Sequence, residues 1–294
     1  GRNAGLDIRT MTTNIKIEAM NKIKFPIWLF ALLLLSGCVK DDLFHTGHPQ
    51  QGAVRVTTTW DGHSSDAVLP LTYVLRLGSE EQTVTGATNV FGSLFFPGKQ
   101  FLSAYNNPAG FTVSGTTATV GTQTDGSLDP TPDNFFAATD TLDIQADAQL
   151  DVTLPMKQYT RQLILTLYLS AGDERRISTT SSTLTGVASS VDFSTGHLSA
   201  TTGHTLHPSF VLGTGSSTRA TAAPQSVLTA TIRLLGVDTA EKQQLTVNVM
   251  MTNGTAETVT SDITDALKNF SVGTLDPLVL NATLTLSSDA GIHA

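Results

Sequence analysis

The strongest constraint on the fold is a two-residue alternation of apolar and polar side chains, which recurs in short runs along the chain. In the stretch AVRVTTTW, Val54 and Val56 fall on one side of an extended backbone and Arg55 on the other. The run at 278–286 alternates in the same way. This period is typical of β-strands that are buried on one face. Because the runs are short and bounded by turn signals such as Asp-Gly and Asn-Gly, the sequence predicts many short strands.

Threonine supports the strand interpretation. The chain has 46 threonines, and the branched threonine side chain suits a pleated sheet better than a helix. Serine- and threonine-rich sequence is also typical of disordered segments. Hydrophobic residues make up 40% of this chain and recur in order, which favours a folded protein.

The order of the expected elements indicates the fold class. We expect about fourteen strands without a regular alternation of strand and helix, which argues against a parallel α/β enzyme fold. Short strands joined by turns are typical of β-sandwiches. The prediction is an all-β chain with two tandem antiparallel β-sandwich domains, at 52–156 and 157–290, and one short helix near the C-terminus.

Two segments are expected to depart from strand structure. Residues 121–134 contain a single apolar side chain, Leu128, and predict an exposed loop in the first domain. The stretch TSDITDALKNF predicts the helix, with Ser261 as its N-cap and an apolar stripe at positions i, i+4 and i+7. We expect this helix to lie across the last hairpin of the second domain.

The only cysteine, Cys38, directly follows the most apolar run of the chain. That run is about ten residues long and is preceded by two lysines, which is typical of a signal peptide and too short for a membrane span of ~20 residues. The sequence Leu-Ser-Gly-Cys resembles the bacterial lipobox, whose cysteine carries acyl chains such as palmitate. We expect residues 1–37 to be removed, with Met20 as the start of the signal peptide, and 38–51 to form a lipidated tether. The alternative is a buried cysteine in an ordinary N-terminal helix.

The residues after the cysteine bear on localisation. Lys40, Asp41 and Asp42 resemble the surface-export signal of Bacteroides-type lipoproteins, although a solvated charged tether would look similar. We therefore expect the protein to be lipid-anchored in the outer membrane and exposed at the cell surface.

Charge excludes one class of partner. Loss of residues 1–37 removes five of the 17 Lys and Arg residues and two of the 25 Asp and Glu residues, which leaves a formal net charge of 12 − 23 = −11. Such a surface repels phosphate backbones, so no nucleic-acid partner is expected. A single cysteine also leaves no disulfide framework.

The candidates for chemistry are weak. His197, His204 and His207 lie close in sequence, but among Ser, Thr and Gly they favour an exposed loop over a metal site. No nucleophile elbow or phosphate-binding loop occurs, so we expect neither enzymatic activity nor a cofactor. Glycan binding usually needs exposed aromatic platforms. Tyr105 is the best candidate for a platform, and Trp60 is expected in the core.

Several stretches together resemble one known family. The tether and the runs HPQQGAVRVTTTW, LTYVLRL, LPMKQYTRQLILTLYL and LDPLVLNATLTL are similar to fimbrillin-associated anchor proteins of Bacteroides-type bacteria. The resemblance covers most of residues 38–288. It implies two transthyretin-like, Greek-key β-sandwiches, no enzymatic activity, a lipid anchor at Cys38 and attachment to a fimbrial shaft subunit.

Open sheet edges indicate how such attachment could work. An open edge can accept a strand from another subunit. We expect the last strand to be this partner-binding edge, through its alternating residues Leu278, Leu280, Ala282, Leu284 and Leu286. The expected function is an anchor or accessory subunit of a fimbria, joined to the shaft by strand addition. The alternative is a surface lipoprotein that binds a glycan or a host ligand.

Overall fold

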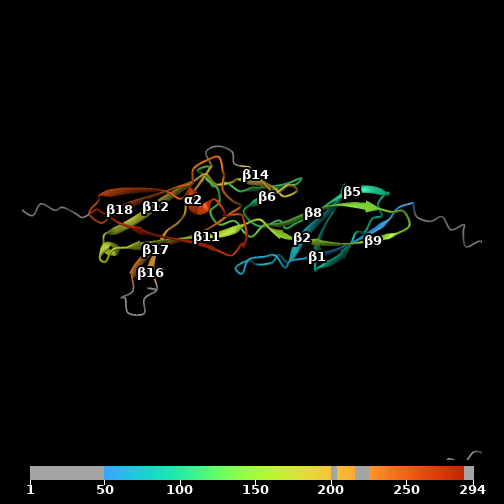
Figure 1. The fold of residues 1–294 in the computed structure, drawn as a ribbon, viewed down its shortest axis with the longest axis horizontal. Helices are drawn as coiled ribbons and strands as arrows, with labels where there is room; N and C mark the ends of the chain where they lie inside the picture. Colours follow the sequence, from blue (N-terminus) through green and yellow to red (C-terminus); the bar gives the residue numbers. More distant parts are fainter. Residues whose placement is uncertain (1–49, 200–203, 216–224, 288–294) are drawn as a thin grey trace, which may run out of the picture. The chain divides into compact units, whose positions relative to one another are not determined.

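A computed structural model describes residues 50–199, 204–215 and 225–287, which belong to one compact unit. The described chain is mostly β-strand in several sheets (Figure 1). One short α-helix, α2 (Thr264–Leu267), lies near the C-terminus, and one 3-10 turn, η3 (Asp173–Arg175), precedes β12. The predicted all-β class with a single short helix near the C-terminus is therefore confirmed.

Two sheets enclose the first core. One has the strand order β4-β1-β9, and the other has the order β10-β8-β5-β2-β3. Their strands are β1 (Ala53–Thr59), β2 (Thr72–Leu77), β3 (Glu80–Thr85), β4 (Thr88–Val90), β5 (Gly98–Tyr105), β8 (Phe136–Ile144), β9 (Gln149–Pro155) and β10 (Lys157–Gln158). Both sheets contribute buried side chains to one cluster, among them Val54, Val56, Leu75, Leu102 and Ile144.

Two further sheets enclose the second core. Their strand orders are β16-β17-β11-β20 and β15-β12-β18-β19. Their strands are β11 (Arg161–Leu169), β12 (Ile177–Thr185), β15 (Thr205–Leu206), β16 (Val211–Gly215), β17 (Gln225–Leu234), β18 (Gln244–Met251), β19 (Ala256–Asp262) and β20 (Leu278–Leu284). β11 is central in its sheet, as its apolar residues on both faces predict.

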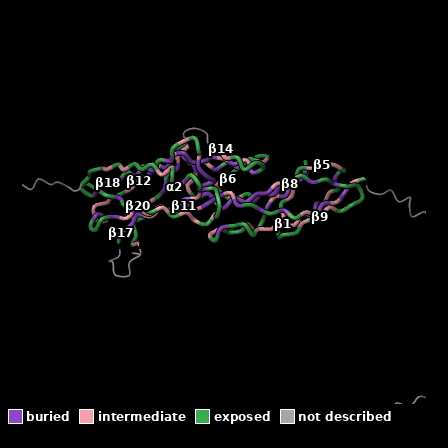
Figure 2. Tube along the Cα trace, viewed as in Figure 1, coloured by how far each residue is buried: buried purple, intermediate pink, exposed green. Residues whose placement is uncertain are grey.

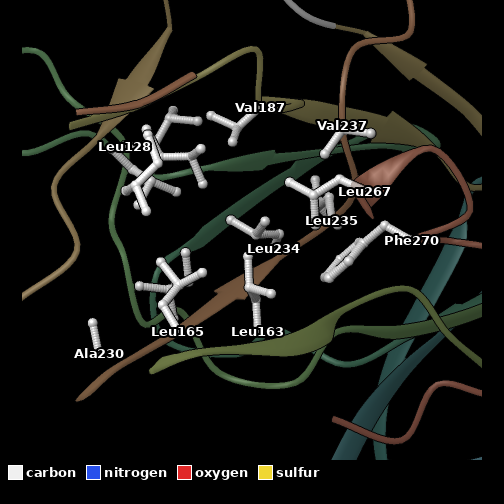
Figure 3. Packing of buried hydrophobic residues seen from close by; sticks show 14 of the residues in the cluster. Leu128, Leu163, Leu165, Val187, Ala230, Leu234, Leu235, Val237, Leu267 and Phe270 are labelled. Atoms are coloured by element: carbon white, nitrogen blue, oxygen red, sulfur yellow. The ribbon is translucent and has the colours of Figure 1, made fainter. Parts of the chain in front are cut away.

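The side chains of the second core come from alternate positions of its strands. Along β11 every second residue is buried, and buried positions alternate with more exposed ones along β18 as well (Figure 2). Leu163 and Leu165 of β11 and Leu234 of β17 lie on the same face of their sheet and belong to the cluster shown in Figure 3. Leu267 and Phe270 close the same cluster from the helix and the turn after it.

A fifth sheet connects distant parts of the sequence. Its order is β14-β13-β7-β6, with β6 (Phe111–Ser114), β7 (Thr117–Val120), β13 (Ser190–Asp192) and β14 (His197–Ser199). β7 pairs with β13 although they lie on opposite sides of the expected domain boundary. The division at residues 156 and 157 stays a prediction, and this sheet shows that segment 111–120 packs with the second half of the chain.

The sequence predicted antiparallel sheets, and most of the described strand pairs are antiparallel, but two pairs are parallel. β1 pairs with β9 in parallel, and β11 pairs with β20 in parallel. In each case the first and last long strands of one half are neighbours, and the intervening strands provide the long connection that a parallel pair requires.

The helix is shorter than predicted. It covers only Thr264–Leu267 and begins after Ile263, whereas Ser261 belongs to β19. Ser261 is opposite Leu245 in the β18–β19 ladder, so pairing with β18 extends the strand past the expected cap. The apolar side chains at 267 and 270 are buried as expected.

The loop at 121–134 is also different from its prediction. Leu128 is only 2% exposed, and its backbone N–H donates to Thr205 O at 2.8 Å. Its side chain joins the second core. The single apolar residue of a polar stretch therefore fastens the stretch to the other half of the chain, which composition alone does not reveal.

Candidate functional site

The strand predicted to bind a partner lies at a sheet edge. β20 pairs with β11 on one side, and no described strand pairs with its other side. Of its alternating residues, Leu284 and Leu286 are buried, Leu278 and Leu280 pack half-buried on the second core, and Ala282 is exposed. The inner face of the strand is thus held by the core while its outer edge is open. A role in partner binding stays a prediction.

Polar contacts hold the start of β20. The carboxylate of Asp276 accepts from the backbone N–H of Ser65 at 2.9 Å, and this bond lowers the pKa of Asp276. Arg161 Nε donates to Asp276 O at 2.7 Å, and its Nη1 donates to Phe270 O at 2.8 Å. Arg161 also lies over the Phe270 ring, 5.4 Å from the centroid. The strand therefore begins at a fixed position.

A second set of contacts holds the end of β20. The backbone N–H of Ser287 donates to Glu257 Oε1 at 2.8 Å. Its carbonyl accepts from Arg176 Nη2 at 2.5 Å, and Arg176 Nη1 lies 2.7 Å from Asp173 Oδ1. The open edge between these two anchor points is consequently a fixed surface.

The chemistry of β20 differs from that of other edge strands. Its sequence, LVLNATL, contains no charged residue and no proline. β9 carries Asp151, whose Oδ1 lies 3.6 Å from Arg55 Nε, and ends in Pro155. β3 has two glutamates, and β19 has a glutamate and an aspartate. Charges and prolines on an edge block pairing with another chain. Among the edge strands described, β20 is the longest one without charge, and β16 at the opposite edge is a shorter example.

The lipidation and export residues cannot be placed. Cys38, Lys40, Asp41 and Asp42 lie outside the described residues. The described chain begins close to β1, so the expected tether leads directly into the first core. Within the part of the chain that the structure describes, none of the helices has the length and apolar character needed to cross a bilayer.

The three histidines do not form a metal centre in the described ranges, where no group of three His, Cys, Asp or Glu side chains is arranged to hold an ion. His197 is opposite Asp192 in the β13–β14 ladder. His207 Nδ1 lies 2.8 Å from Ser182 O, and its Nε2 lies 3.5 Å from Asp125 Oδ2. The ring of His207 thus makes local contacts, whereas His197 is exposed and His204 is half-buried.

Of the aromatic residues considered for glycan binding, Tyr105 is buried and Trp60 packs half-buried against the first core. Tyr105 is only 8% exposed and lies 5.8 Å from the Phe193 ring. Trp60 contacts the rings of Tyr73 and Phe136 edge-on. The core position expected for Trp60 fits its contacts, and Tyr105 offers no exposed platform.

A pocket of about 620 Å³ lies next to the first core. One wall consists of the apolar residues 68–71, and the opposite side carries Asn107, Asp133 and Arg233. Arg233 Nη1 donates to Pro132 O at 2.9 Å, so one donor of the guanidinium is already used within the protein. The pocket is mixed in character and contains no exposed aromatic ring.

Sequence reasoning missed the residues that position β20. Arg161 begins a strand and Asp276 precedes a proline, so neither forms a recognisable motif. Their contacts join positions more than one hundred residues apart. Only a charged residue at the start of an otherwise apolar strand, RQLILTLYL, could have drawn attention to Arg161.

Comparison with family models places the chain in one family. Residues 97–288 match the profile of the family described as fimbrillin-A associated anchor proteins Mfa1 and Mfa2, which is more than half of the chain. Comparison with curated proteins finds no match.

Solved structures share the fold at low sequence identity. A candidate adhesin from Bacteroides thetaiotaomicron has a TM-score of 0.58 and 14% identity, covering 80% of this chain and 92% of its own. The fimbrial anchor protein Mfa2 from Porphyromonas gingivalis has a TM-score of 0.54 and 10% identity, covering 79% and 90%. A candidate polysaccharide-binding protein from B. thetaiotaomicron has a TM-score of 0.52 and 9% identity, covering 81% and 93%. These likenesses extend over most of each chain and concern the fold alone.

Proposed function

Because the chain belongs to the family of fimbrillin-A associated anchor proteins, we propose that it is a surface lipoprotein that anchors a fimbria to the outer membrane or joins it as an accessory subunit. Its partner in this role is a fimbrial shaft subunit. The role is structural and needs no catalytic group and no cofactor.

The membrane end of the proposed anchor is Cys38. The basic head, the apolar run and the small residues before this cysteine support lipidation. Stable anchoring needs more than one acyl chain, and a triacylated cysteine satisfies that. The segment 39–51 between Cys38 and the folded unit reaches ~45 Å when fully extended, which would let the folded unit stand clear of the lipid headgroups. Lys40, Asp41 and Asp42 would direct the protein to the outer face.

The shaft end of the proposed anchor is the outer edge of β20. The observation that carries this assignment is a long edge strand without charge, fastened at Asp276 and Ser287 and open between them. A strand from a shaft subunit added here would form main-chain hydrogen bonds along β20, and its alternate side chains would rest on the neighbouring surface.

A matched pair of substitutions tests the shaft end. Val279 in β20 is 49% exposed, and Val90 in the edge strand β4 is 51% exposed. We expect Val279→Lys to prevent capture of shaft subunits, because a charged side chain on an edge opposes strand addition. Val90→Lys should capture them as the wild type does. Measurement is by pull-down from surface material and by counting fimbriae retained on cells. Equal capture by both variants would exclude β20 as the contact.

The membrane end is tested separately. Wild-type protein should incorporate labelled palmitate and fractionate with the outer membrane, and Cys38→Ser should do neither. Mass spectrometry of the mature N-terminus gives the modification directly. An unmodified N-terminus on wild-type protein would contradict the lipoprotein assignment.

The ligand-binding alternative is supported by one observation, the pocket next to the first core. Its exposed polar residues, Asn107 and Asp133, would contact a glycan there. If the protein binds a glycan on an array, Asn107→Ala and Asp133→Ala should weaken that binding, whereas Val279→Lys should not. The two functions therefore predict opposite responses to the same set of variants.

A further inference from the structure

In each half the first long strand and the last long strand are parallel neighbours in continuous register. In the first half the ladder runs from Ala53 opposite Gln149 to Thr59 opposite Pro155. In the second half it runs from Leu163 opposite Leu278 to Leu169 opposite Leu284. The two halves thus repeat one arrangement, although their intervening strands differ.

This arrangement determines how a pull on the chain ends acts on each ladder. The chain enters the first half at the start of β1 and runs from the end of β9 into the short strand β10, which pairs with β8. In a parallel pair the start of β1 and the end of β9 are at opposite ends. It enters the second half at the start of β11 and leaves it at the end of β20. Tension between the two ends of the described chain therefore slides each pair of strands along its axis in opposite directions.

Sliding and peeling differ in how they load hydrogen bonds. The bonds of a parallel ladder are evenly spaced along the strands, so a sliding load falls on all of them at once. An antiparallel hairpin pulled at its open end instead loses its bonds one after another. Resistance to force follows the unfolding rate along the pulling direction, which the equilibrium stability does not determine.

We propose that this protein carries tension along the chain, with the β1–β9 and β11–β20 ladders acting as two mechanical clamps loaded in shear. Force applied between the tether before β1 and the C-terminal end of β20 would load both parallel ladders in shear, the direction in which they resist unfolding most. Force applied across the open end of a hairpin would instead break its hydrogen bonds one at a time and meet less resistance.

The connection between the two clamps is reinforced by side chains. Ser64 N donates to Gln158 Oε1 at 2.8 Å, and Gln158 Nε2 donates back to Ser64 Oγ at 3.0 Å. Ser65 N donates to Asp276 Oδ1 at 2.9 Å, just before β20. The loop after β1 is thereby fastened to the strand after β9 and to the start of β20, so the covalent connection at 156–160 is not the only link between the ladders.

The proposal rests on the proposed function only for where the membrane and the shaft would pull on the protein. Its test uses the isolated protein and needs no fimbria. In the full chain with Cys38→Ser, Gln51→Cys and Ser287→Cys provide attachment points before β1 and after β20. Both positions are half-buried or exposed at the surface. Single-molecule force spectroscopy then records the unfolding force along the chain. Handles fused to the two ends of the chain give the same geometry without internal substitutions.

Two control geometries pull the same protein in peeling mode. Thr72→Cys with Thr85→Cys loads the open end of the β2–β3 hairpin, where these residues are partners. Gln244→Cys with Ser261→Cys loads the open end of the β18–β19 hairpin. All variants should have the same midpoint in chemical denaturation, since only the direction of force differs.

We expect the unfolding force between 51 and 287 to be severalfold higher than the force in either hairpin geometry. Equal forces in all three geometries, or a lower force between 51 and 287, would overturn the proposal. A high force together with unchanged shaft capture by Val279→Lys would support the clamps while rejecting β20 as the contact. The mechanical proposal and the proposed function can therefore fail independently.

Discussion

The two halves of the chain share a strand arrangement and differ at the edge beside it. In the first half β1 is central and β9 forms the edge, and in the second half β11 is central and β20 forms the edge. Asp151, its ion pair with Arg55 and Pro155 protect β9 from pairing with another chain, whereas β20 has no such protection. The same frame therefore ends in a charged edge strand with a proline in one half and in an uncharged edge strand in the other.

Two adjacent residues contribute to different cores. Phe135 and Phe136 are adjacent and fully buried, but they belong to different cores. Phe135 lies 5.3 Å from Phe111 and 5.9 Å from Phe193, while Phe136 lies 5.4 Å from Trp60. One strand start thus contributes to both halves.

The largest expected effect on stability comes from truncating one of these two phenylalanines, since each substitution weakens a different core. Phe135→Ala and Phe136→Ala should each lower the free energy of unfolding by ~3–5 kcal/mol, because each leaves a cavity in a packed core. Hydrogen exchange should rise in β11 and β17 for Phe135→Ala, and in β1 and β2 for Phe136→Ala. If both substitutions loosened the same strands, the two cores would behave as one.

A smaller effect tests the contacts that hold the open edge. Arg161→Ala leaves the carbonyls of Asp276 and Phe270 without their donor, so we expect a loss of ~1–3 kcal/mol in the free energy of unfolding. The matched change in the first half, Arg55→Ala, removes only an exposed ion pair and should cost less than ~1 kcal/mol. Urea denaturation compares them. A larger loss for Arg55→Ala would show that the start of β20 is held by other contacts.

A still smaller change in stability is expected from a substitution that removes the charge from the edge strand β9. Asp151→Val removes the charge from β9 and should change the free energy of unfolding by only ~0.5 kcal/mol, because the residue is exposed. It should nevertheless promote self-association through the freed edge. Sedimentation velocity over a range of concentrations measures this. A variant that stays in the wild-type association state would indicate that Asp151 does not protect β9.

The smallest effect concerns a charged edge of the second half. Bonds from the Thr264 hydroxyl and its backbone N–H, together with Lys242 at 3.2 Å, lower the pKa of Asp262 in β19 to about 2 from its ordinary value of 3.8. The carboxylate therefore contributes stability above pH 3.8 that is lost as the pH falls through about 2. Asp262→Asn should flatten the pH dependence of unfolding in that window. An unchanged pH profile would mean that other carboxylates dominate acid unfolding.

Much of the local structure follows from the sequence. The alternation in β1, β11 and β20 predicts both the strands and their buried faces, because side chains on an extended backbone alternate whatever the strand pairs with. The apolar positions 267 and 270 likewise predict a buried turn of helix. The length of that helix was overestimated, since pairing of Ser261 with β18 competes with the expected cap.

By itself the sequence determined the fold class, the family resemblance and the position of an uncharged strand near the end of the chain. Only the tertiary structure decided that β1 pairs with β9 and β11 with β20, that Leu128 reaches the second core, and that β20 is an edge. The physical reason is that strands pair through backbone hydrogen bonds, which are alike for every residue. A pattern of side chains therefore records which face of a strand is buried, while its neighbours depend on how the whole chain packs.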